Sequence, residues 1–347
     1  MRKRIAFVIV TLFISIAVPC VLGELVVRLF RLAHPISTEY SNFTSLPYLA
    51  YGPKPNSHQV GKTATGEFDY DYKHNSFGLR DEEHALHKTR GAFRILGLGD
   101  SFTYGVGANY VETYLYRLER NLNARPGRHP NVEVIKAGIP KFFTEPERML
   151  LQGLGKEFQP DLVIVGFIVN DVIDAYFCLD AVTVNKSGFL LTRQAAELGD
   201  FCFELYKHSH LCRLIISKYV SWRINRDYRP DWKEVYKKNG FHEADWIKVE
   251  SEFQKIASTT ESIGADLLII NIPQRGPWTE EHNYPQHRLG QWAKARGIAF
   301  LDLLPAMKQA QKEQSLYYTK DGHCTPAGYS IVADELAKFI VERRLVP

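Results

Sequence analysis

Five short apolar runs constrain the fold of this chain more than any other feature of its sequence. They span residues 93–99, 132–137, 161–169, 266–272 and 298–303. Each run is too short for an ordinary helix and is rich in Val, Ile, Leu or Phe, which is typical of strands buried on both faces. The runs therefore predict the strands of a central sheet that is covered on both sides.

Segments with helical patterns separate these strands. They span residues 110–124, 144–156 and 245–263, and a last one begins near residue 325. Thr144 and Glu147 are spaced as a capping box, and Thr325 is placed as an N-cap with Pro326 at the first helical position. The alternation predicts the α/β class: a three-layer α/β/α fold around a doubly wound, mainly parallel, five-stranded sheet.

The first 33 residues predict a membrane anchor. A basic start, Arg2 to Arg4, precedes the uncharged apolar run 5–23, which is close to the roughly 20 residues that a helix needs to cross a bilayer. Pro19 and Cys20 interrupt the small-residue pattern of a cleavage site. This favours a retained single-pass helix over a cleaved signal or a buried helix of a soluble protein. The positive-inside rule then keeps the basic start in the cytoplasm and places the rest on the periplasmic or extracellular side.

The remainder of the chain divides by composition. Residues 34–92 are rich in Pro, Gly, Tyr, Asn and His and are predicted to form a stalk and an extended lead-in, followed by the α/β domain over 93–347. Residues 172–244 interrupt the alternation with many aromatic residues. An insertion this long between two strands is usually a cap or lid over a site. Its aromatic residues would suit an acyl pocket, a platform for stacking sugars or a small core.

Composition excludes some partners and leaves the redox state open. The chain is 45% hydrophobic and 24% charged, so it can bury a core, and its net charge of +4 is spread along the sequence without a basic-aromatic stripe. We therefore predict no nucleic-acid partner. Outside the anchor, Cys178, Cys202, Cys212 and Cys324 allow two disulfides, one or none. Their spacing matches no zinc pattern, and we predict neither a metal nor a cofactor.

The stretch GDSFTYG, which follows the first predicted strand, contains the candidate nucleophile Ser101. It lacks the third glycine of a dinucleotide-binding loop and the Gly-Lys-Ser/Thr of a phosphate loop. Sites in open α/β sheets form just beyond the strand ends, where Ser101 lies, although a plain turn serine would also fit this fragment. His323 follows Asp321 by two positions, so in an extended segment both side chains point to one side, as a base and its orienting acid require.

Two further segments end the second and third predicted strands. Gly138 would let a backbone N–H approach a ligand closely, and the side-chain amide of Asn170 could donate to an oxyanion. Taken alone, Asn170 and Asp171 would also suit a strand-terminating turn. Because the ends of these strands meet in a doubly wound sheet, we expect Gly138 and Asn170 to lie near Ser101.

The segments GDSFTYG, AGIP, NDV and DGHCTPAGY resemble, in this order, the four blocks of the SGNH (GDSL-like) hydrolase superfamily. The resemblance implies a flavodoxin-like catalytic domain and a serine esterase mechanism. It implies Ser101 as the nucleophile, His323 as the base and Asp321 as the acid, with Asp100 and Asp171 in supporting positions.

The resemblance further implies an oxyanion hole formed by the Ser101 N–H, Gly138 and Asn170. Three positions depart from the family pattern: Ile168 replaces a glycine, Lys136 replaces an asparagine, and Lys320 stands where the acid is usually found. The chain must therefore use the shorter Asp-x-His form. These departures bear on the reaction rate and on the choice of substrate.

The segment HNSFGLRDEE, residues 74–83, resembles the lead-in of membrane-anchored bacterial members of this superfamily, which act in the acylation of cell-surface polysaccharide or glycolipid. Within it, Arg80 and Asp81 would brace the lead-in or line the site. The resemblance implies an acyl or acetyl esterase outside the membrane, with an acylated carbohydrate or lipid as substrate. The alternatives are an O-acyltransferase of cell-surface polysaccharide, served by a membrane-bound acyl-donor protein, and a non-catalytic glycan-binding protein.

Overall fold

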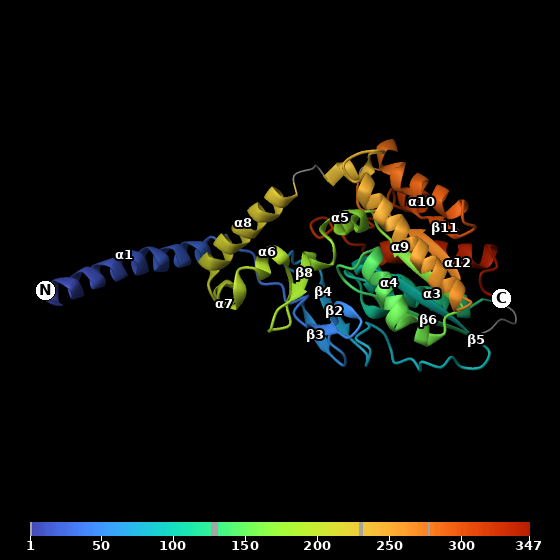
Figure 1. Cartoon of the computed structure of the whole chain (residues 1–347), viewed down its shortest axis with the longest axis horizontal. Coiled ribbons are helices and arrows are strands. Elements are labelled where there is room, and N and C mark those ends of the chain that lie inside the picture. Colours follow the sequence, from blue (N-terminus) through green and yellow to red (C-terminus); the bar gives the residue numbers. More distant parts are fainter. Residues whose placement is uncertain (1, 126–130, 229–231, 277) are drawn as a thin grey trace.

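A long N-terminal helix, α1 (Arg2–Leu29), projects from an α/β domain in the computed structural model (Figure 1). The structure describes residues 2–125, 131–228, 232–276 and 278–347. Met1 of the predicted anchor and residues 229–231 of the predicted insertion lie outside the described residues. Within α1, residues Lys3–Leu29 are long and apolar enough to cross a membrane or to act as a signal sequence.

The central sheet has five parallel strands. These are β5 (Ala92–Gly99), β6 (Asn131–Gly138), β7 (Leu162–Phe167), β10 (Asp266–Asn271) and β11 (Ala299–Asp302), so all five predicted strands are confirmed. Their order is β11-β10-β7-β5-β6. The chain places β6 on one side of β5 and β7 on the other, which makes the carboxyl ends of β5 and β7 a topological switch point, the usual ligand site of such sheets.

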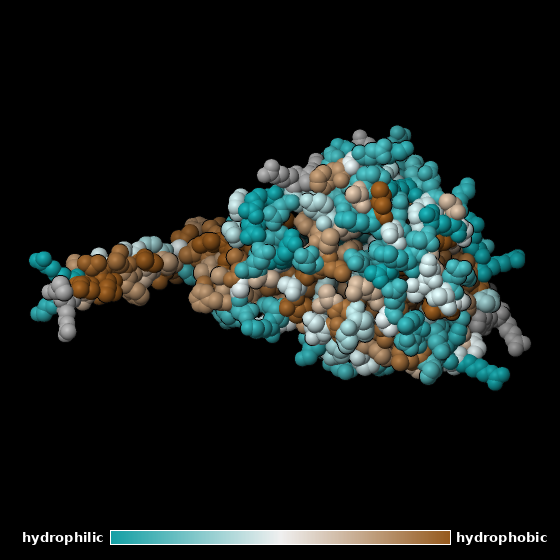
Figure 2. Space-filling model, in the orientation of Figure 1, coloured by the Kyte–Doolittle hydropathy of each residue, from teal (hydrophilic) through white to brown (hydrophobic). Residues whose placement is uncertain are grey.

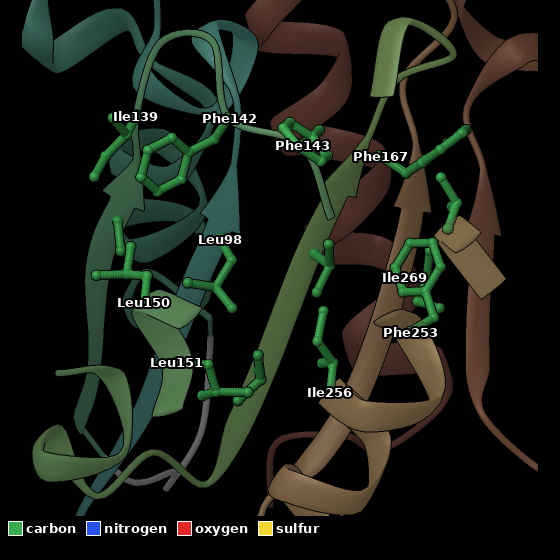
Figure 3. Packing of buried hydrophobic residues seen from close by; sticks show 14 of the residues in the cluster. Leu98, Ile139, Phe142, Phe143, Leu150, Leu151, Phe167, Phe253, Ile256 and Ile269 are labelled. Carbon is green, nitrogen blue, oxygen red and sulfur yellow. The ribbon is translucent and has the colours of Figure 1, made fainter. Parts of the chain in front are cut away.

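Helices cover both faces of this sheet and confirm the predicted fold class. One face is covered by α4 (Thr144–Gly153), α9 (Glu243–Ser262) and α10 (Tyr284–Lys294), and the other by α3 (Tyr114–Asn123), α11 (Leu304–Ala310) and α12 (Pro326–Glu342). Successive strand residues point to opposite faces, so Leu96 and Leu98 pack toward α4 and Ile95 toward α3. Figure 3 shows the packing of the sheet against α4 and α9. Each fully buried Leu, Ile or Phe side chain contributes roughly 1.5–3 kcal/mol.

Two predicted helix starts have different outcomes. The hydroxyl of Thr325 accepts from the backbone N–H of Gly328 at 3.3 Å, which confirms the N-cap of α12. The predicted capping box at Thr144 and Glu147 is wrong, because Phe143 is the N-cap of α4. Thr144 is thereby the first helical residue, and both polar side chains turn into the interior, where neither has a hydrogen-bond partner among the described residues.

The lead-in folds onto the domain as two antiparallel hairpins. The first pairs β1 (Phe43–Leu46) with β2 (Leu49–Pro53), and the second pairs β3 (His58–Lys62) with β4 (Asp69–Lys73). The side chains of Tyr51, Tyr72 and Leu79 are almost fully buried. This segment is therefore packed against the α/β domain along much of its length.

The insertion begins with the end of α5 (Asn170–Phe177), which packs on α9 within the domain, and continues toward α1. There it forms the hairpin β8 (Val182–Val184) and β9 (Leu190–Thr192) and the helices α6 (Arg193–Ala196), α7 (Gly199–His208) and α8 (His210–Asp227). In Figure 1 these helices lie on the side of the domain from which α1 projects, and the C-terminus lies on the far side. Helix α2 (Ser101–Tyr104) and the short 3-10 helices η1 (Tyr110–Glu112), η2 (Gly155–Phe158), η3 (Leu179–Ala181), η4 (Trp232–Tyr236) and η5 (Glu280–Asn283) complete the fold.

Candidate active site

Ser101 begins the short helix α2 directly after strand β5. Asp100 caps this helix, because its Oδ1 accepts from the backbone N–H of Phe102 at 2.8 Å. The helix ends at Gly105, whose φ of 87° favours glycine and whose N–H donates to the Ser101 carbonyl. This strand–turn–helix unit holds the Ser101 hydroxyl at the carboxyl edge of the sheet, beside the switch point between β5 and β7.

The structure brings Ser101, His323 and Asp321 together. Oγ of Ser101 lies 2.8 Å from Nε2 of His323, and Nδ1 of His323 lies 2.5 Å from Oδ1 of Asp321. Since an ionised carboxylate can only accept, Nδ1 carries the ring proton and Nε2 is left to accept from the serine hydroxyl. The ring of Phe102 packs against the imidazole, with 4.9 Å between the ring centroids. This is the geometry that a serine nucleophile, its base and an orienting acid require.

Glu67, in the turn between β3 and β4, holds the loop that carries Asp321. Its carboxylate accepts from the backbone N–H groups of Thr319, Lys320 and Asp321 at 3.0, 2.9 and 2.7 Å, and from the Thr319 hydroxyl at 2.7 Å. Desolvation opposes the charge of Glu67, but these hydrogen bonds keep its pKa below the usual value. Glu67 could not be identified from the sequence, because its partners are backbone groups about 250 residues away along the chain and no local motif marks it.

Arg80 braces the turn that follows the nucleophile. Its guanidinium donates to the carbonyl oxygens of Gly105 at 2.8 Å, Ala108 at 2.9 Å and Tyr104 at 3.2 Å. The side chain is buried and also lies over the ring of Tyr72. Of the two roles considered for Arg80, these contacts are those of a structural brace.

Asp81 is tied to β6, the edge strand of the sheet. Its carboxylate lies 3.1 Å from Nζ of Lys136, which also pairs with Glu119 at 2.9 Å. Burial works against both charges, but the pairing lowers the pKa of Asp81 and raises that of Lys136. Lys136, which departs from the family pattern, therefore belongs to a buried ion pair that anchors the lead-in.

Asn170, at the start of α5, lies beside the nucleophile. Its Nδ2 donates to Asp100 and to Asp174, both at 3.3 Å, and Oδ2 of Asp100 also lies 3.4 Å from Oγ of Ser101. The other end of the amide is fixed by Gln274, whose Nε2 donates to Oδ1 of Asn170 at 3.2 Å. Gln274 therefore fixes the orientation of the amide, with its donor side toward Asp100 and Asp174. Gln274 lies in the loop after β10 and was not predicted from the sequence, because no local motif surrounds it.

Gly138, at the end of β6, lies directly against the nucleophile helix. A Cβ atom at this position would lie 2.2 Å from the Tyr104 nitrogen and 2.4 Å from the Thr103 carbonyl carbon. Such distances exclude any side chain, so a glycine is needed for α2 to pack against the neighbouring strand. The structure thus places Gly138 and Asn170 on two sides of the Ser101 turn.

Three buried carboxyl groups and the half-buried Asp174 surround the base of this site. Burial raises the pKa of Asp100, and it raises the pKa of Asp174 to about 6. Asp171 and Glu147 are fully buried, and their carboxyl oxygens have no hydrogen-bond partner among the described residues. Burial and the proximity of the other carboxylates raise both pKa values well above the usual range. Asp171 therefore lies beneath the site in the interior, and the triad does not include it.

The remaining predictions concern cysteines and metals. All five cysteines are free, so of the alternatives left open the structure has no disulfide. Within the part of the chain that the structure describes, no group of three or more His, Cys, Asp or Glu side chains could hold a metal ion.

Several solved structures resemble this one in fold. An acetylxylan esterase from Geobacillus stearothermophilus, in a catalytic mutant form, is 15% identical, with 72% of this chain and 94% of that chain covered and a TM-score of 0.44. The psychrotrophic esterase EstA from a Pseudoalteromonas species is 12% identical, with coverages of 72% and 97% and a TM-score of 0.42. TesA is 14% identical, with coverages of 73% and 99% and a TM-score of 0.44. No curated protein sequence matches the chain.

A sequence model of one protein family also matches the chain. The model is that of the GDSL-like Lipase/Acylhydrolase family, and it matches residues 98–331. This range begins within β5 and ends within α12, so it contains Ser101, Gly138, Asn170, Asp321 and His323.

Proposed function

The chain belongs to the GDSL-like lipase and acylhydrolase family, and this membership supports an ester hydrolase activity. We propose that the protein uses Ser101 to release acyl groups from an acylated carbohydrate or lipid. One observation carries this proposal. The hydroxyl of Ser101 lies in hydrogen-bond contact with Nε2 of His323, and Asp321 orients the ring from its other side. A serine is a weak nucleophile without such a base.

The reaction follows from the positions of these groups. His323 accepts the hydroxyl proton as Oγ of Ser101 attacks the ester carbonyl, and the carboxylate of Asp321 stabilises the imidazolium that forms. The Ser101 N–H, Gly138 and the Asn170 amide stabilise the oxyanion. His323 then gives its proton to the leaving alcohol oxygen as the ester C–O bond breaks. A water molecule, deprotonated by His323, releases the acyl group as a carboxylic acid.

Helix α1 serves this enzyme as a retained membrane anchor. The carboxylate of Glu24 accepts from the Ser209 hydroxyl and from the N–H groups of His210 and Leu211, at the first turn of α8, and Val27 is buried. These contacts make the C-terminal end of α1 part of the folded domain, which supports retention of the helix. Protease digestion of intact spheroplasts tests the orientation: a domain outside the membrane is degraded, whereas protection of the domain would contradict it.

Release of acetate from a short-chain chromogenic ester tests the proposed activity. The full chain, reconstituted in lipid nanodiscs, is compared with Ser101→Ala, and we expect the variant to fall to the uncatalysed rate. Equal activity of both proteins would overturn the assignment. Adding sugar acceptors to the same reaction separates the two enzymatic candidates, because a transferase places the acyl group on the sugar and a hydrolase releases it as the free acid.

A further inference from the structure

An apolar cavity of about 350 Å³ lies between the lead-in and the helices of the insertion. Among the side chains that line it are Ile36 and Tyr40 from the lead-in, Leu191 from β9, Phe203 from α7 and Val220 from α8. Its volume falls in the range of roughly 300–1,000 Å³ that is typical of ligand pockets. The cavity is thus large enough for a ligand. The lead-in and the insertion form its walls, and both lie outside the three central layers of the fold.

The lead-in connects this cavity to helix α2, which begins at Ser101. Ser37 and Tyr40 line the cavity, and Glu39 between them is buried, accepting from the hydroxyl of Tyr72 at 3.0 Å. The ring of Tyr72 packs edge-on against that of Tyr104 in α2, with 5.0 Å between the ring centroids. One short segment therefore borders the cavity and, through Tyr72, contacts the helix that carries Ser101.

The opposite side of the cavity adjoins the membrane anchor. Helix α8, which supplies part of the cavity wall, begins where Glu24 of α1 caps it, and Gly23 lies against Leu211. The uncharged apolar run of the proposed anchor ends at Gly23, which places this junction near the membrane surface in the proposed arrangement. Figure 2 shows that the hydrophobic surface of α1 continues onto this end of the domain, where Phe201 and Trp222 are exposed. The cavity is therefore bordered on one side by α8, which contacts the anchor, and on the other by the lead-in, which contacts α2 through Tyr72.

The chemistry of the lining selects one class of ligand. Most lining side chains are apolar, and burying sugar hydroxyls against them without hydrogen bonds would cost several kcal/mol. An acetyl group would leave most of the volume empty. A hydrocarbon chain gains about 0.8 kcal/mol for each methylene that it buries. We propose that this cavity binds the fatty acyl chain of the ester cleaved at Ser101, so that the substrate is a lipid ester drawn from the membrane. This inference rests on the proposed esterase function and names its acyl group.

A series of chromogenic esters from acetyl to decanoyl tests the inference on the full chain in nanodiscs. We expect kcat/KM to rise about fourfold for each added methylene until the cavity is filled. In Ala195→Trp, which places a large ring in the cavity, the rise should disappear. Ala196→Trp makes the same change at the next position of α6, which does not line the cavity, and should retain the rise. A flat series in the unmodified protein, or an unchanged rise in Ala195→Trp, would overturn the inference.

A second measurement tests the cavity without catalysis. Cys202 is free and lines the cavity, whereas Cys212 is free and does not. We expect decanoate to slow alkylation of Cys202 and to leave Cys212 unaffected, as followed by peptide mass spectrometry. Equal rates with and without decanoate would contradict binding there. If no ester is cleaved in a manner that depends on Ser101, the proposed function fails, and the Cys202 result still decides whether the cavity holds an acyl chain.

Discussion

Replacing Asp321 with alanine removes the group that orients the catalytic base. In the structure its carboxylate accepts the Nδ1 proton of His323 at 2.5 Å, which leaves Nε2 free to accept the proton of Ser101. Without it, the ring can rotate, and either nitrogen can carry the proton. The imidazolium that forms during the attack also loses its neighbouring negative charge.

The structure predicts that this change leaves the loop in place. Glu67 holds the loop through backbone N–H groups of Thr319, Lys320 and Asp321, which an alanine retains. The loss should therefore be that of the orienting carboxylate alone. Removing such a residue lowers turnover by about 10⁴-fold, or about 5 kcal/mol of transition-state stabilisation.

The assay is kcat/KM for an acetyl ester with the full chain in nanodiscs, together with the melting temperature. Lys320→Ala is the matched control, because its side chain is exposed and only its backbone contacts Glu67. We expect Lys320→Ala to keep the rate of the unmodified protein. An Asp321→Ala variant that stays folded and retains activity within tenfold would refute the assignment of Asp321 as the orienting acid.

Three further predictions concern the groups around Ser101. Asn170→Ala should lower kcat by about 100- to 1,000-fold and leave a measurable rate, because one oxyanion donor is lost; an unchanged kcat would contradict this role. Gln274→Ala should lower kcat about fivefold with little change in KM, since one neutral hydrogen bond is worth about 1 kcal/mol. The loss should vanish in an Asn170→Ala background, and a loss that persists there would exclude a positioning role. Burial raises the pKa of Asp174 to about 6, whereas the carboxyl group of the unfolded chain loses its proton near pH 4. The free energy of unfolding should therefore fall by up to about 3 kcal/mol as the pH rises from 4 to 6. Asp174→Asn removes this fall. The melting temperature of the variant, relative to that of the unmodified protein, should therefore increase from pH 4 to pH 7. A difference between the two melting temperatures that stays constant over this range would contradict the raised pKa.

The layered fold could be predicted because its signals are local. A parallel strand buried on both faces must be apolar along its length, so all five strands were visible as short runs in the sequence. The candidate triad was visible for a similar reason. Ser101 directly follows one of these strands, and the two-residue spacing of Asp321 and His323 places both side chains on one side of an extended segment.

The remaining features depend on contacts between distant segments. Glu67 and Gln274 act through partners that are distant in the sequence, and no nearby motif indicates these contacts. From the sequence alone, both side chains could equally have been exposed to solvent. The pattern at Thr144 and Glu147 is that of a capping box, but tertiary packing turned both side chains inward and shifted the helix start. The cavity beside Tyr40 required the lead-in and the insertion to meet, which sequence periodicity does not encode.

The most direct test of the account is the site at which a serine-directed fluorophosphonate modifies the full chain. The reagent forms a stable bond only with an activated hydroxyl, so the account predicts one adduct, on the peptide that contains Ser101, found by mass spectrometry after digestion. His323→Ala should abolish the adduct because the hydroxyl then lacks its base. A folded protein that stays unlabelled at Ser101, or that is labelled equally in His323→Ala, would contradict the claim that Ser101 is the catalytic nucleophile.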